Sequence, residues 1–184
     1  MLVAERARGA SVLNLFGYTG GFSLQAAAAG ARSTDTVDSA KGAVEAARRN
    51  FEVNQLASAA AKFHVDDAFD FLTRAGQRGG RWEIVISDPP SFARSKDAVP
   101  AALQAYRRLH RLAASVTAPG GLLCAASCSS HVTKEGFVKT VEVGAHQAGR
   151  RWQLESWTGA AFDHPSLAAF PEGDYLKFAI GRLF

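Results

Sequence analysis

Two patterns of hydrophobic and polar residues alternate along the whole chain, one typical of strands and the other typical of helices. Short runs rich in β-branched and apolar residues predict strands, and longer stretches with apolar residues three or four positions apart predict helices. The predicted strands are 11–16, 34–38, 62–65, 82–86, 122–127, 152–157 and 175–183. The predicted helices are 22–30, 41–55, 67–74, 98–116 and 133–148.

This alternation predicts an α/β fold with a Rossmann-like, doubly wound sheet of seven strands and helices on both faces. Repeated strand–helix units imply parallel strands, whereas the last two strands have no helix between them, so we expect an antiparallel last strand. Residues 75–81, with three glycines, predict a loop, and Pro119-Gly120-Gly121 are expected to stop the preceding helix. At 184 residues, the chain is expected to be one domain, 1–184.

A carboxylate stands where the fourth predicted strand ends. Asp88-Pro89-Pro90 follows the apolar run 82–86, and two prolines can continue neither a strand nor a helix interior. Asp88 is therefore expected on a stiff turn at the carboxyl edge of the sheet, where open α/β sheets bind their ligands. Because strand–Asp–Pro turns also occur as ordinary loops, this motif alone leaves the function open.

The first predicted strand leads into a glycine-rich turn, Gly17-Tyr18-Thr19-Gly20-Gly21, ahead of an Ala-rich helix. Such a turn lets backbone N–H groups approach a ligand closely. The spacing is not G-x-G-x-x-G and no Gly-Lys-Ser/Thr follows, which disfavours a dinucleotide or a nucleoside triphosphate. Asp38 ends the second strand, where an acid hydrogen-bonds ribose hydroxyls. S-adenosylmethionine, a nucleoside without a pyrophosphate, fits both features; the alternative is an ordinary Rossmann-like core with an accidental acid.

Net charge narrows the function only slightly. A formal charge of +4 and a pI of about 9.3 are compatible with nucleic-acid binding without establishing it. Arg94, Lys96 and Lys134 follow strand ends, so we expect them to rim the ligand edge. The arginines of the helix 98–116 are typical of a solvated helix face instead.

Other features concern compartment and cysteine chemistry. No apolar run reaches the ~18 residues that span a bilayer, and the N-terminus lacks the pattern of a signal peptide, so we expect a cytoplasmic protein.

Cys124 and Cys128 lie on one predicted strand, about 13 Å apart at ~3.3 Å per residue, too far for a disulfide. Cys124, in mid-strand, is expected to be a core residue. The five histidines are scattered and no zinc spacing is present.

Several motifs stand in a fixed order along the chain. They are Asn14-Leu15-Phe16-Gly17-Tyr18-Thr19-Gly20-Gly21-Phe22, Val37-Asp38, Asp66-Asp67, Asp88-Pro89-Pro90-Ser91-Phe92, Ser127-Cys128-Ser129 and Pro171-Glu172-Gly173-Asp174-Tyr175-Leu176-Lys177. Together they resemble the catalytic domain of the 23S ribosomal RNA large subunit methyltransferase I family, which is similar to other class I S-adenosylmethionine-dependent methyltransferases. The first and last motifs are specific, whereas the Asp-Pro-Pro turn is shared more widely. Family members carry an N-terminal RNA-binding module and a linking β-rich segment; with the first core strand near residue 11, we expect both to be missing here.

The resemblance implies methylation of cytosine carbon 5 in 23S ribosomal RNA through a cysteine adduct. Cys128 would add to carbon 6 of the ring, and Asp88 would bind the ring nitrogen and the exocyclic amine. A helix N-terminus and Lys134 nearby are expected to favour the Cys128 thiolate. Pro89 and Phe92 would contact the extruded base, unless Phe92 is a core residue.

The resemblance also implies an S-adenosylmethionine site. The residues expected near its methionine and ribose are Asn14, Phe16, Tyr18, Thr19 and Gly20. Asp38 would bind the ribose hydroxyls, and Asp67 with the Ala68 backbone would lie beside the adenine. Asp66 competes with Asp67 for that role or caps the following helix. Asp88 is expected to reach the cofactor as well as the base.

Two other functions stay open. The Asp-Pro-Pro turn equally suits methyl transfer to a guanine or amine nitrogen, or to a small molecule, and only Cys128 favours carbon 5. A further possibility is a cofactor-binding module that needs a partner chain to bind RNA. The connection between the last two strands, with Asp163-His164-Pro165 and Glu172, is expected either to form a substrate wall or simply to join them.

Overall fold

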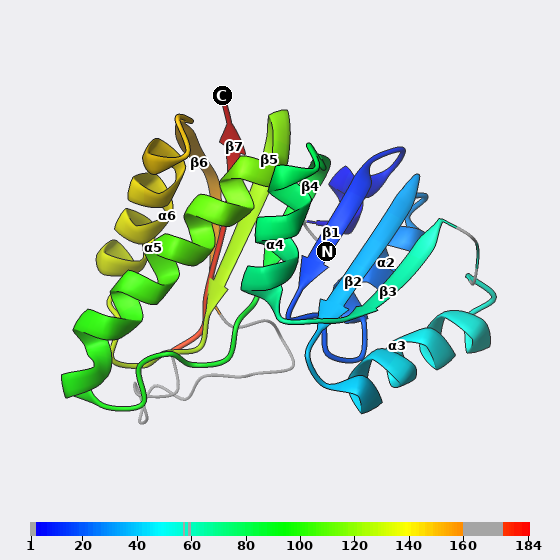
Figure 1. Cartoon of the computed structure of the whole chain (residues 1–184), viewed down its shortest axis with the longest axis horizontal. Helices are drawn as coiled ribbons and strands as arrows, with labels where there is room; N and C mark the ends of the chain where they lie inside the picture. The colour runs from blue at the N-terminus through cyan, green and yellow to red at the C-terminus, as the bar shows by residue number, and fades with distance from the viewer. Residues whose placement is uncertain (1–2, 57, 59, 160–174) are drawn as a thin grey trace.

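Seven strands form one sheet in the order β3-β2-β1-β4-β5-β7-β6 in the computed structural model, which describes residues 3–56, 58, 60–159 and 175–184 (Figure 1). The parallel strands are β1 (Ser11–Leu15), β2 (Ser33–Asp38), β3 (Ala61–Val65), β4 (Trp82–Ser87) and β5 (Thr117–Ser127). The last strand, β7 (Lys177–Leu183), runs antiparallel to both β5 and β6 (Trp152–Thr158). The predicted mostly parallel sheet with an antiparallel last strand is confirmed.

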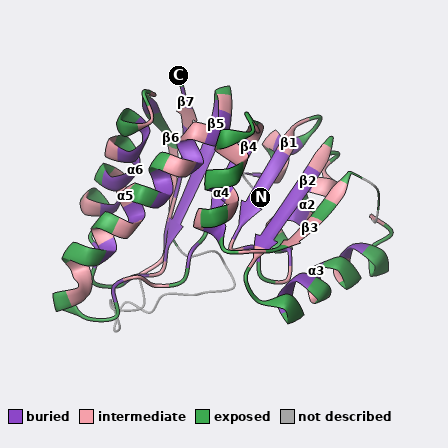
Figure 2. Ribbon diagram, in the orientation of Figure 1, coloured by how far each residue is buried: buried purple, intermediate pink, exposed green. Residues whose placement is uncertain are grey.

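Helices cover both faces of this sheet. On one face α4 (Ala68–Gln77), α5 (Val99–Val116) and α6 (Lys134–Gln147) bury the larger core cluster, which includes Leu13, Val85, Leu123, Tyr106 and Phe137. On the other face lie α1 (Ala4–Ala7), α2 (Gly21–Ala28) and α3 (Lys41–Val53), with Val12, Ile86 and Cys124 in a smaller cluster. Figure 2 shows the central strands almost wholly buried and the outer sides of α3 and α5 exposed. No helix within the described ranges is both long and apolar enough to cross a bilayer.

A buried carboxylate sits under α4, away from the predicted site residues. Asp35 of β2 accepts a hydrogen bond from Trp82 Nε1 (2.9 Å) and shares one with His64 Nε2 (2.7 Å). Burial alone would raise the pKa of Asp35, but these hydrogen bonds and the charges of His64 and Lys62 outweigh it, so the pKa lies below its ordinary value. This cluster joins three strands of the sheet on its α4 side.

Two element boundaries differ from the prediction by three residues or more. The segment 75–81 is only partly a loop, because α4 continues through Gly76 to Gln77; Ala75 packs against the core there, which outweighs the low helix propensity of glycine. The fifth strand begins at Thr117, directly after α5, and passes irregularly through Pro119-Gly120-Gly121. The short α1 was not predicted, since four residues show no periodicity.

Candidate active site

The turn after β1 is strained at two residues that carry side chains. Phe16 (φ 56°) and Tyr18 (φ 46°) both adopt the left-handed conformation, as does Gly20 (φ 83°). The Gly17 N–H donates to the Val37 carbonyl (2.9 Å), and the Gly20 N–H donates to the Gly17 carbonyl (2.7 Å), which fixes the turn beside β2. Strain of this kind persists only where the surroundings impose it, and it gathers at ligand sites.

A buried polar network lies beneath this turn. Asn14 Nδ2 (3.1 Å) and Thr36 Oγ1 (2.7 Å) both donate to Ser23 Oγ at the start of α2. Asn14 Oδ1 is buried and accepts no hydrogen bond from the described part of the chain. A Cβ atom at Gly17 would lie 2.6 Å from Thr36 Cγ2, so a side chain at this position would force the neighbouring atoms to shift. The orphaned Asn14 oxygen fits a ligand with an amino donor.

Asp38 joins the turns that follow β1 and β2. Its Oδ2 accepts from the Tyr18 N–H (2.9 Å) and its Oδ1 from the Ala40 N–H (2.9 Å). A carboxylate offers about four acceptor positions, so both oxygens can still accept from a ribose hydroxyl. Asn50 Nδ2 donates to the Thr19 carbonyl (2.9 Å) and anchors the turn to α3.

The two acids after β3 have different roles. Asp67 is the N-cap of α4, since its Oδ1 accepts from the N–H groups of Phe69 (2.9 Å) and Asp70 (3.1 Å). Asp66 forms an ion pair with Arg74 instead. Of the two roles considered for Asp66, the helix cap is therefore wrong. Only one Asp67 oxygen serves the cap, so the other is available at the edge of the site, next to the first residue of α4, Ala68.

Asp88 and Cys128 lie near each other at the carboxyl ends of β4 and β5. These strands pair with Ser87 opposite Ala125, and the Asp88 carboxylate acts electrostatically on the Cys128 thiol. Asp88 has no hydrogen-bond partner among the residues with described positions, and although its side chain is open to solvent, nearby protein atoms desolvate it and raise its pKa. The site thus holds an unpartnered carboxylate beside a half-buried thiol.

The Cys128 thiol is less acidic than the sequence predicted. Burial raises the pKa of Cys128 and the Asp88 charge raises it further, against smaller opposing effects of backbone N–H groups and Lys177. The expected stabilisation of the thiolate was wrong, because the pKa of Cys128 is raised. Lys134 Nζ lies over the Trp157 ring, 4.5 Å from its centroid. The cation that acts on the thiol is Lys177, whose Nζ donates to the Ser129 carbonyl (2.9 Å).

A phenol in α5 ties the two candidate catalytic loops together. Tyr106 Oη shares hydrogen bonds with Ser127 Oγ (2.9 Å) and Ser129 Oγ (3.0 Å), the residues on either side of Cys128. Ser129 Oγ in turn shares a hydrogen bond with Ser91 Oγ (2.9 Å), three residues after Asp88. Sequence reasoning missed this network, since Tyr106 sits in mid-helix with the spacing of an ordinary core residue.

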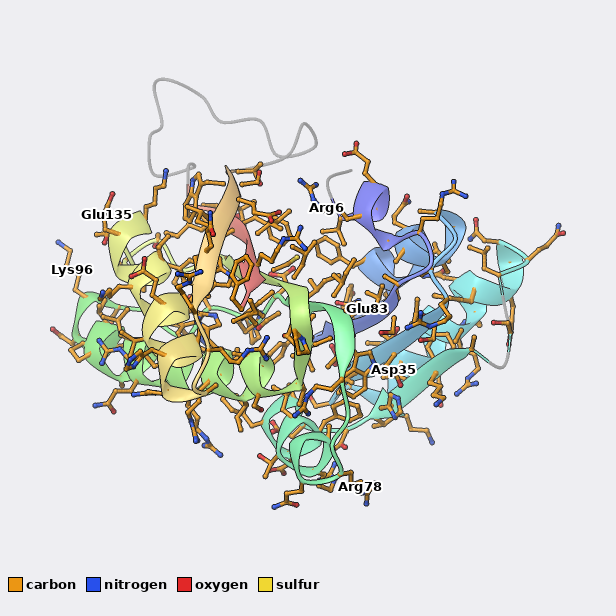
Figure 3. All side chains as sticks on the ribbon, turned by 90° about the horizontal axis from the view of Figure 1, so that it is seen from above. Arg6, Asp35, Arg78, Glu83, Lys96 and Glu135 are labelled. Carbon is orange, nitrogen blue, oxygen red and sulfur yellow. The ribbon has the colours of Figure 1, made fainter. Side chains whose placement is uncertain are left out.

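The residues predicted to contact the substrate lie in different surroundings, some buried and some exposed. Pro89 is buried and Phe92 half-buried, with the Phe92 ring centroid 4.8 Å from that of Tyr106, so its contacts are those of the core alternative. Arg94 and Lys96 are exposed, and Figure 3 shows Lys96 pointing outward on the side of the molecule that carries Glu135. Asp163, His164, Pro165 and Glu172, considered as a substrate wall, lie outside the described residues.

The sequence of this chain matches a known protein family and several curated proteins. Residues 1–155 match the family described as S-adenosylmethionine-dependent methyltransferase. Proteins named Ribosomal RNA large subunit methyltransferase I from Salmonella arizonae and Salmonella newport are each 40% identical over 166 residues, which is 90% of this chain and 41% of theirs. The chain thus spans about two fifths of the length of these curated relatives.

Solved structures with this fold were also found. SMU.776, crystallised in complex with SAH, covers 98% of this chain with a TM-score of 0.85 and 31% identity, over 47% of its own length. The 16S rRNA N2 G1207 methyltransferase of T. thermophilus, solved with AdoMet and guanosine, superposes with a TM-score of 0.63 at 20% identity over 97% of this chain and 38% of its own, a likeness of fold. The strained turn, the orphaned Asn14 oxygen and Asp38 fit the cofactor that the matched family uses. This chain belongs to the S-adenosylmethionine-dependent methyltransferase family.

Proposed function

We propose that this chain carries the methyl-transferring site of an enzyme that methylates carbon 5 of a cytosine in large-subunit ribosomal RNA. The observation that carries the proposal is the half-buried Cys128 thiol beside the unpartnered Asp88 carboxylate. The names of the Salmonella relatives support the RNA substrate. Neither carbon 5 nor the adduct follows from those names; both rest on the chemistry of this pair.

The cofactor side of the site has its own residues. S-adenosylmethionine supplies an electrophilic methyl group when it is bound. The turn after β1, with Phe16, Tyr18, Thr19 and Gly20, and the orphaned Asn14 oxygen would hold its methionine end and ribose. The ribose hydroxyls would meet Asp38. The adenine would lie against Asp67 and the Ala68 backbone, at the start of α4.

Cytosine carbon 5 is a weak nucleophile, and addition of Cys128 to the ring would activate it. Its sulfur forms a bond to carbon 6, and the thiol proton passes to the Asp88 carboxylate. The electron pair of the 5,6 double bond becomes available at carbon 5, which would bond to the methyl group as the bond between that methyl and the sulfonium sulfur breaks, leaving a neutral thioether. A solvent base then removes the carbon-5 proton, the 5,6 double bond reforms and the carbon–sulfur bond breaks. Cys128 leaves as a thiolate and takes back the proton held by Asp88, which restores both groups. Covalent catalysis of this kind divides one difficult step into easier ones.

Asp88 would hold the base during this sequence. Its protonated carboxyl donates to ring nitrogen 3, while its other oxygen accepts from the exocyclic amine, so charge that develops on the ring is stabilised. The raised pKa of Asp88 favours this protonated form. Pro89 fixes the turn that presents the carboxyl, and Phe92 would border the base on its core side.

The RNA strand would reach the site along exposed cations. Arg94, Lys96 and Lys134 are all exposed and follow β4 or β5. Contacts of this kind position a strand through its phosphates without reading its sequence. Target bases in loops or unpaired strands cost least to extrude.

A second candidate function keeps methyl transfer but changes the acceptor to a guanine or amine nitrogen. The observation that favours it is the raised pKa of Cys128, which leaves the thiol largely protonated at neutral pH. In that reaction Asp88 alone would hold the amino group, and Cys128 would be dispensable. A non-catalytic role, as a module that binds the cofactor and needs a partner chain for RNA, is the remaining alternative.

Replacement of Cys128 by alanine separates these functions. We expect Cys128→Ala to bind S-adenosylmethionine normally by calorimetry and to lose methyl transfer to ribosomal RNA, with 5-methylcytidine as the wild-type product in nucleoside mass spectrometry. Cys124→Ala is the matched control, because that thiol is buried in mid-strand and burial raises its pKa to about 12. Full activity in Cys128→Ala, or methylguanosine as the product, would exclude the adduct. Cofactor binding without methylation of any RNA by the wild type would favour the non-catalytic module.

A further inference from the structure

Tyr18 combines an exposed side chain with a strained backbone. The residue is 69% exposed, and its φ of 46° lies in the left-handed region, which is unfavourable for a residue with a bulky side chain. Its ring and hydroxyl make no ring contact or hydrogen bond with the described part of the chain. Phe16 is strained in the same turn, but its ring packs against the larger core cluster. Packing therefore accounts for the side chain of Phe16 and not for that of Tyr18.

The backbone of Tyr18 is fixed on both sides. Its N–H donates to Asp38 Oδ2 (2.9 Å), and the carbonyl of the next residue, Thr19, accepts from Asn50 Nδ2 (2.9 Å). Both bonds use only main-chain groups of the turn, so they would form with any non-proline side chain at position 18. Strain that the fold does not require is found mainly at functional sites, which directs attention to the tyrosine ring itself.

The turn that carries Tyr18 is next to the turn that carries Asp88. β1 pairs in parallel with β4, with Leu15 opposite Ser87, so the two turns leave neighbouring strands about 4.8 Å apart. The start of α4, where the adenine of the cofactor is expected, follows β3, which lies beyond β2 in the sheet. In the order of the strands, the Tyr18 turn therefore stands between the expected adenine site and the candidate catalytic pair.

Other aromatic rings at this edge of the sheet are already packed. Phe92 is half-buried, and its ring centroid lies 4.8 Å from that of Tyr106 and 6.5 Å from that of Phe69. Among the Phe, Tyr and Trp residues with described positions, only Tyr18 and Phe184 are exposed. Phe184 follows β7 at the opposite edge of the sheet, where Figure 1 marks the C-terminus. Of these described residues, Tyr18 thus offers the exposed ring at the edge that carries Asp88.

We propose that the Tyr18 ring stacks on the RNA base next to the cytosine that enters the active site. This inference rests on the proposed function. A base that reaches Asp88 and Cys128 has left its stack, which uncovers a face of each neighbouring base. An aromatic side chain can cover such a face whatever the base, because every base has a π-face. Since the turn is already fixed by its own hydrogen bonds, its backbone needs no further ordering when the RNA binds.

A fluorescent base tests the stack directly. The probe is a single-stranded RNA fragment containing the cytosine that the wild type methylates, with 2-aminopurine at each flanking position in turn. Stacking on an aromatic ring quenches 2-aminopurine, so at one position the wild type should quench the probe more strongly than Tyr18→Leu does. Leucine keeps the Cβ atom and the backbone strain but removes the ring. Tyr18→Phe keeps the ring and should quench like the wild type.

Binding measurements distinguish a stack from a charge contact. RNA affinity of Tyr18→Leu should fall by about 5- to 100-fold, the range expected for one base stacked on an aromatic ring. The slope of log K against log salt should not change, because no phosphate contact is lost. Affinity for S-adenosylmethionine should also stay the same, since the main-chain bond to Asp38 is kept. Phe184→Leu is the matched control, an exposed aromatic residue at the opposite edge, and should bind RNA like the wild type.

Three results would overturn the stack. The first is equal quenching, or equal RNA affinity, in the wild type and Tyr18→Leu. The second is a loss of affinity for S-adenosylmethionine with RNA binding unchanged, which would assign the ring to the cofactor. The third is a clearly lower free energy of unfolding in Tyr18→Leu, which would assign the ring to the fold. Methylation of the same fragment by the wild type is measured in parallel. Normal methylation with equal quenching refutes only the stack, whereas absent methylation refutes the proposed function.

Discussion

Replacing Tyr106 by phenylalanine removes a single oxygen atom that both candidate catalytic loops share. The Tyr106 phenol bonds to Ser127 and Ser129, which flank Cys128, and Ser129 continues the network to Ser91 in the loop that carries Asp88. The ring itself would stay, because it packs between Phe92, His110 and Phe137. Tyr106→Phe thus loosens the attachment of the two loops to each other without opening a large hole in the core.

The structure sets the size of the effect. Two buried hydrogen bonds of 2.9 and 3.0 Å are lost, each with a net value of about 0.5–1.5 kcal/mol, so the free energy of unfolding should fall by about 1–3 kcal/mol. The serines keep other partners, including the bond from the Ser129 N–H to Ser127 Oγ (3.2 Å). A shift of the reacting groups by about 1 Å costs on the order of 100-fold in rate. We expect methyl transfer to slow by about 10- to 100-fold.

The assay is single-turnover transfer of a labelled methyl group to ribosomal RNA, with affinity for S-adenosylmethionine measured separately. Affinity should be unchanged, because the hydrogen bonds and ring contacts of Tyr106 are made to residues other than those expected to hold the cofactor. Burial raises the pKa of Tyr106 above its ordinary value, so the phenol stays protonated and the slowing should be the same from pH 6 to 9. Thr140→Val is the control: Thr140 Oγ1 also bridges α5 and α6, sharing a bond with His110 Nδ1 (3.1 Å) and donating to the Phe137 carbonyl (2.6 Å).

Two outcomes would refute this reasoning. Wild-type turnover in Tyr106→Phe, well below its unfolding temperature, would mean that the network stabilises the fold without positioning the catalytic groups. Equal slowing in Thr140→Val would mean that lost stability, rather than lost alignment at Cys128, sets the rate.

The other predictions concern the thiol, the glycine turn and acid stability. Asp88→Asn removes the charge that raises the pKa of Cys128, so iodoacetamide should alkylate Cys128 several-fold faster at pH 8 even though methyl transfer is lost; a slower reaction would contradict the coupling. Gly17→Ala should lower the free energy of unfolding by about 1–3 kcal/mol, because its Cβ atom would clash with Thr36 Cγ2. Adding Thr36→Ser, which removes that methyl group, should restore part of the lost stability, as measured by urea titration. The folded pKa of Asp35 lies below its ordinary 3.8, so its contribution to stability is present above about pH 4 and lost as pH falls through the folded value. The free energy of unfolding of Asp35→Asn should be about 2 kcal/mol lower than that of the wild type at pH 7, and this difference should shrink as the pH falls through the folded pKa of Asp35.

The sheet could be predicted because each strand carries its own signal. The run 82–86 is bounded by charges and prolines, and the structure places β4 at Trp82–Ser87. The positions of Asp38 and Asp88 followed from those strand ends, since the carboxyl ends of parallel strands share one edge. The α4 boundary was less predictable, because core packing at Ala75 overrides local glycine propensity.

The supporting interactions could not be predicted, because they depend on tertiary packing. The partners of Tyr106 are set by how α5 lies across the end of β5. Lys177 reaches the site because the antiparallel register places it opposite Ser127, a pairing between residues 50 positions apart that no local pattern encodes. Its one sequence signal was its place at the end of the specific Pro-Glu-Gly-x-Tyr-Leu-Lys motif.

The raised pKa of the Cys128 thiol determines how Asp88 and Cys128 would share a proton during the reaction. Each of the two groups, Asp88 and Cys128, sits where desolvation disfavours its charged form, and each negative charge disfavours the other, so the site accommodates one negative charge more readily than two. The resting form is then carboxylate with thiol, and proton transfer within the pair gives carboxylic acid with thiolate at no change in net charge. That second form has both the nucleophile for carbon 6 and the donor for ring nitrogen 3. A pair with one shared charge therefore supplies both groups that the proposed adduct requires, whereas an independently acidic cysteine would leave Asp88 ionised and unable to donate.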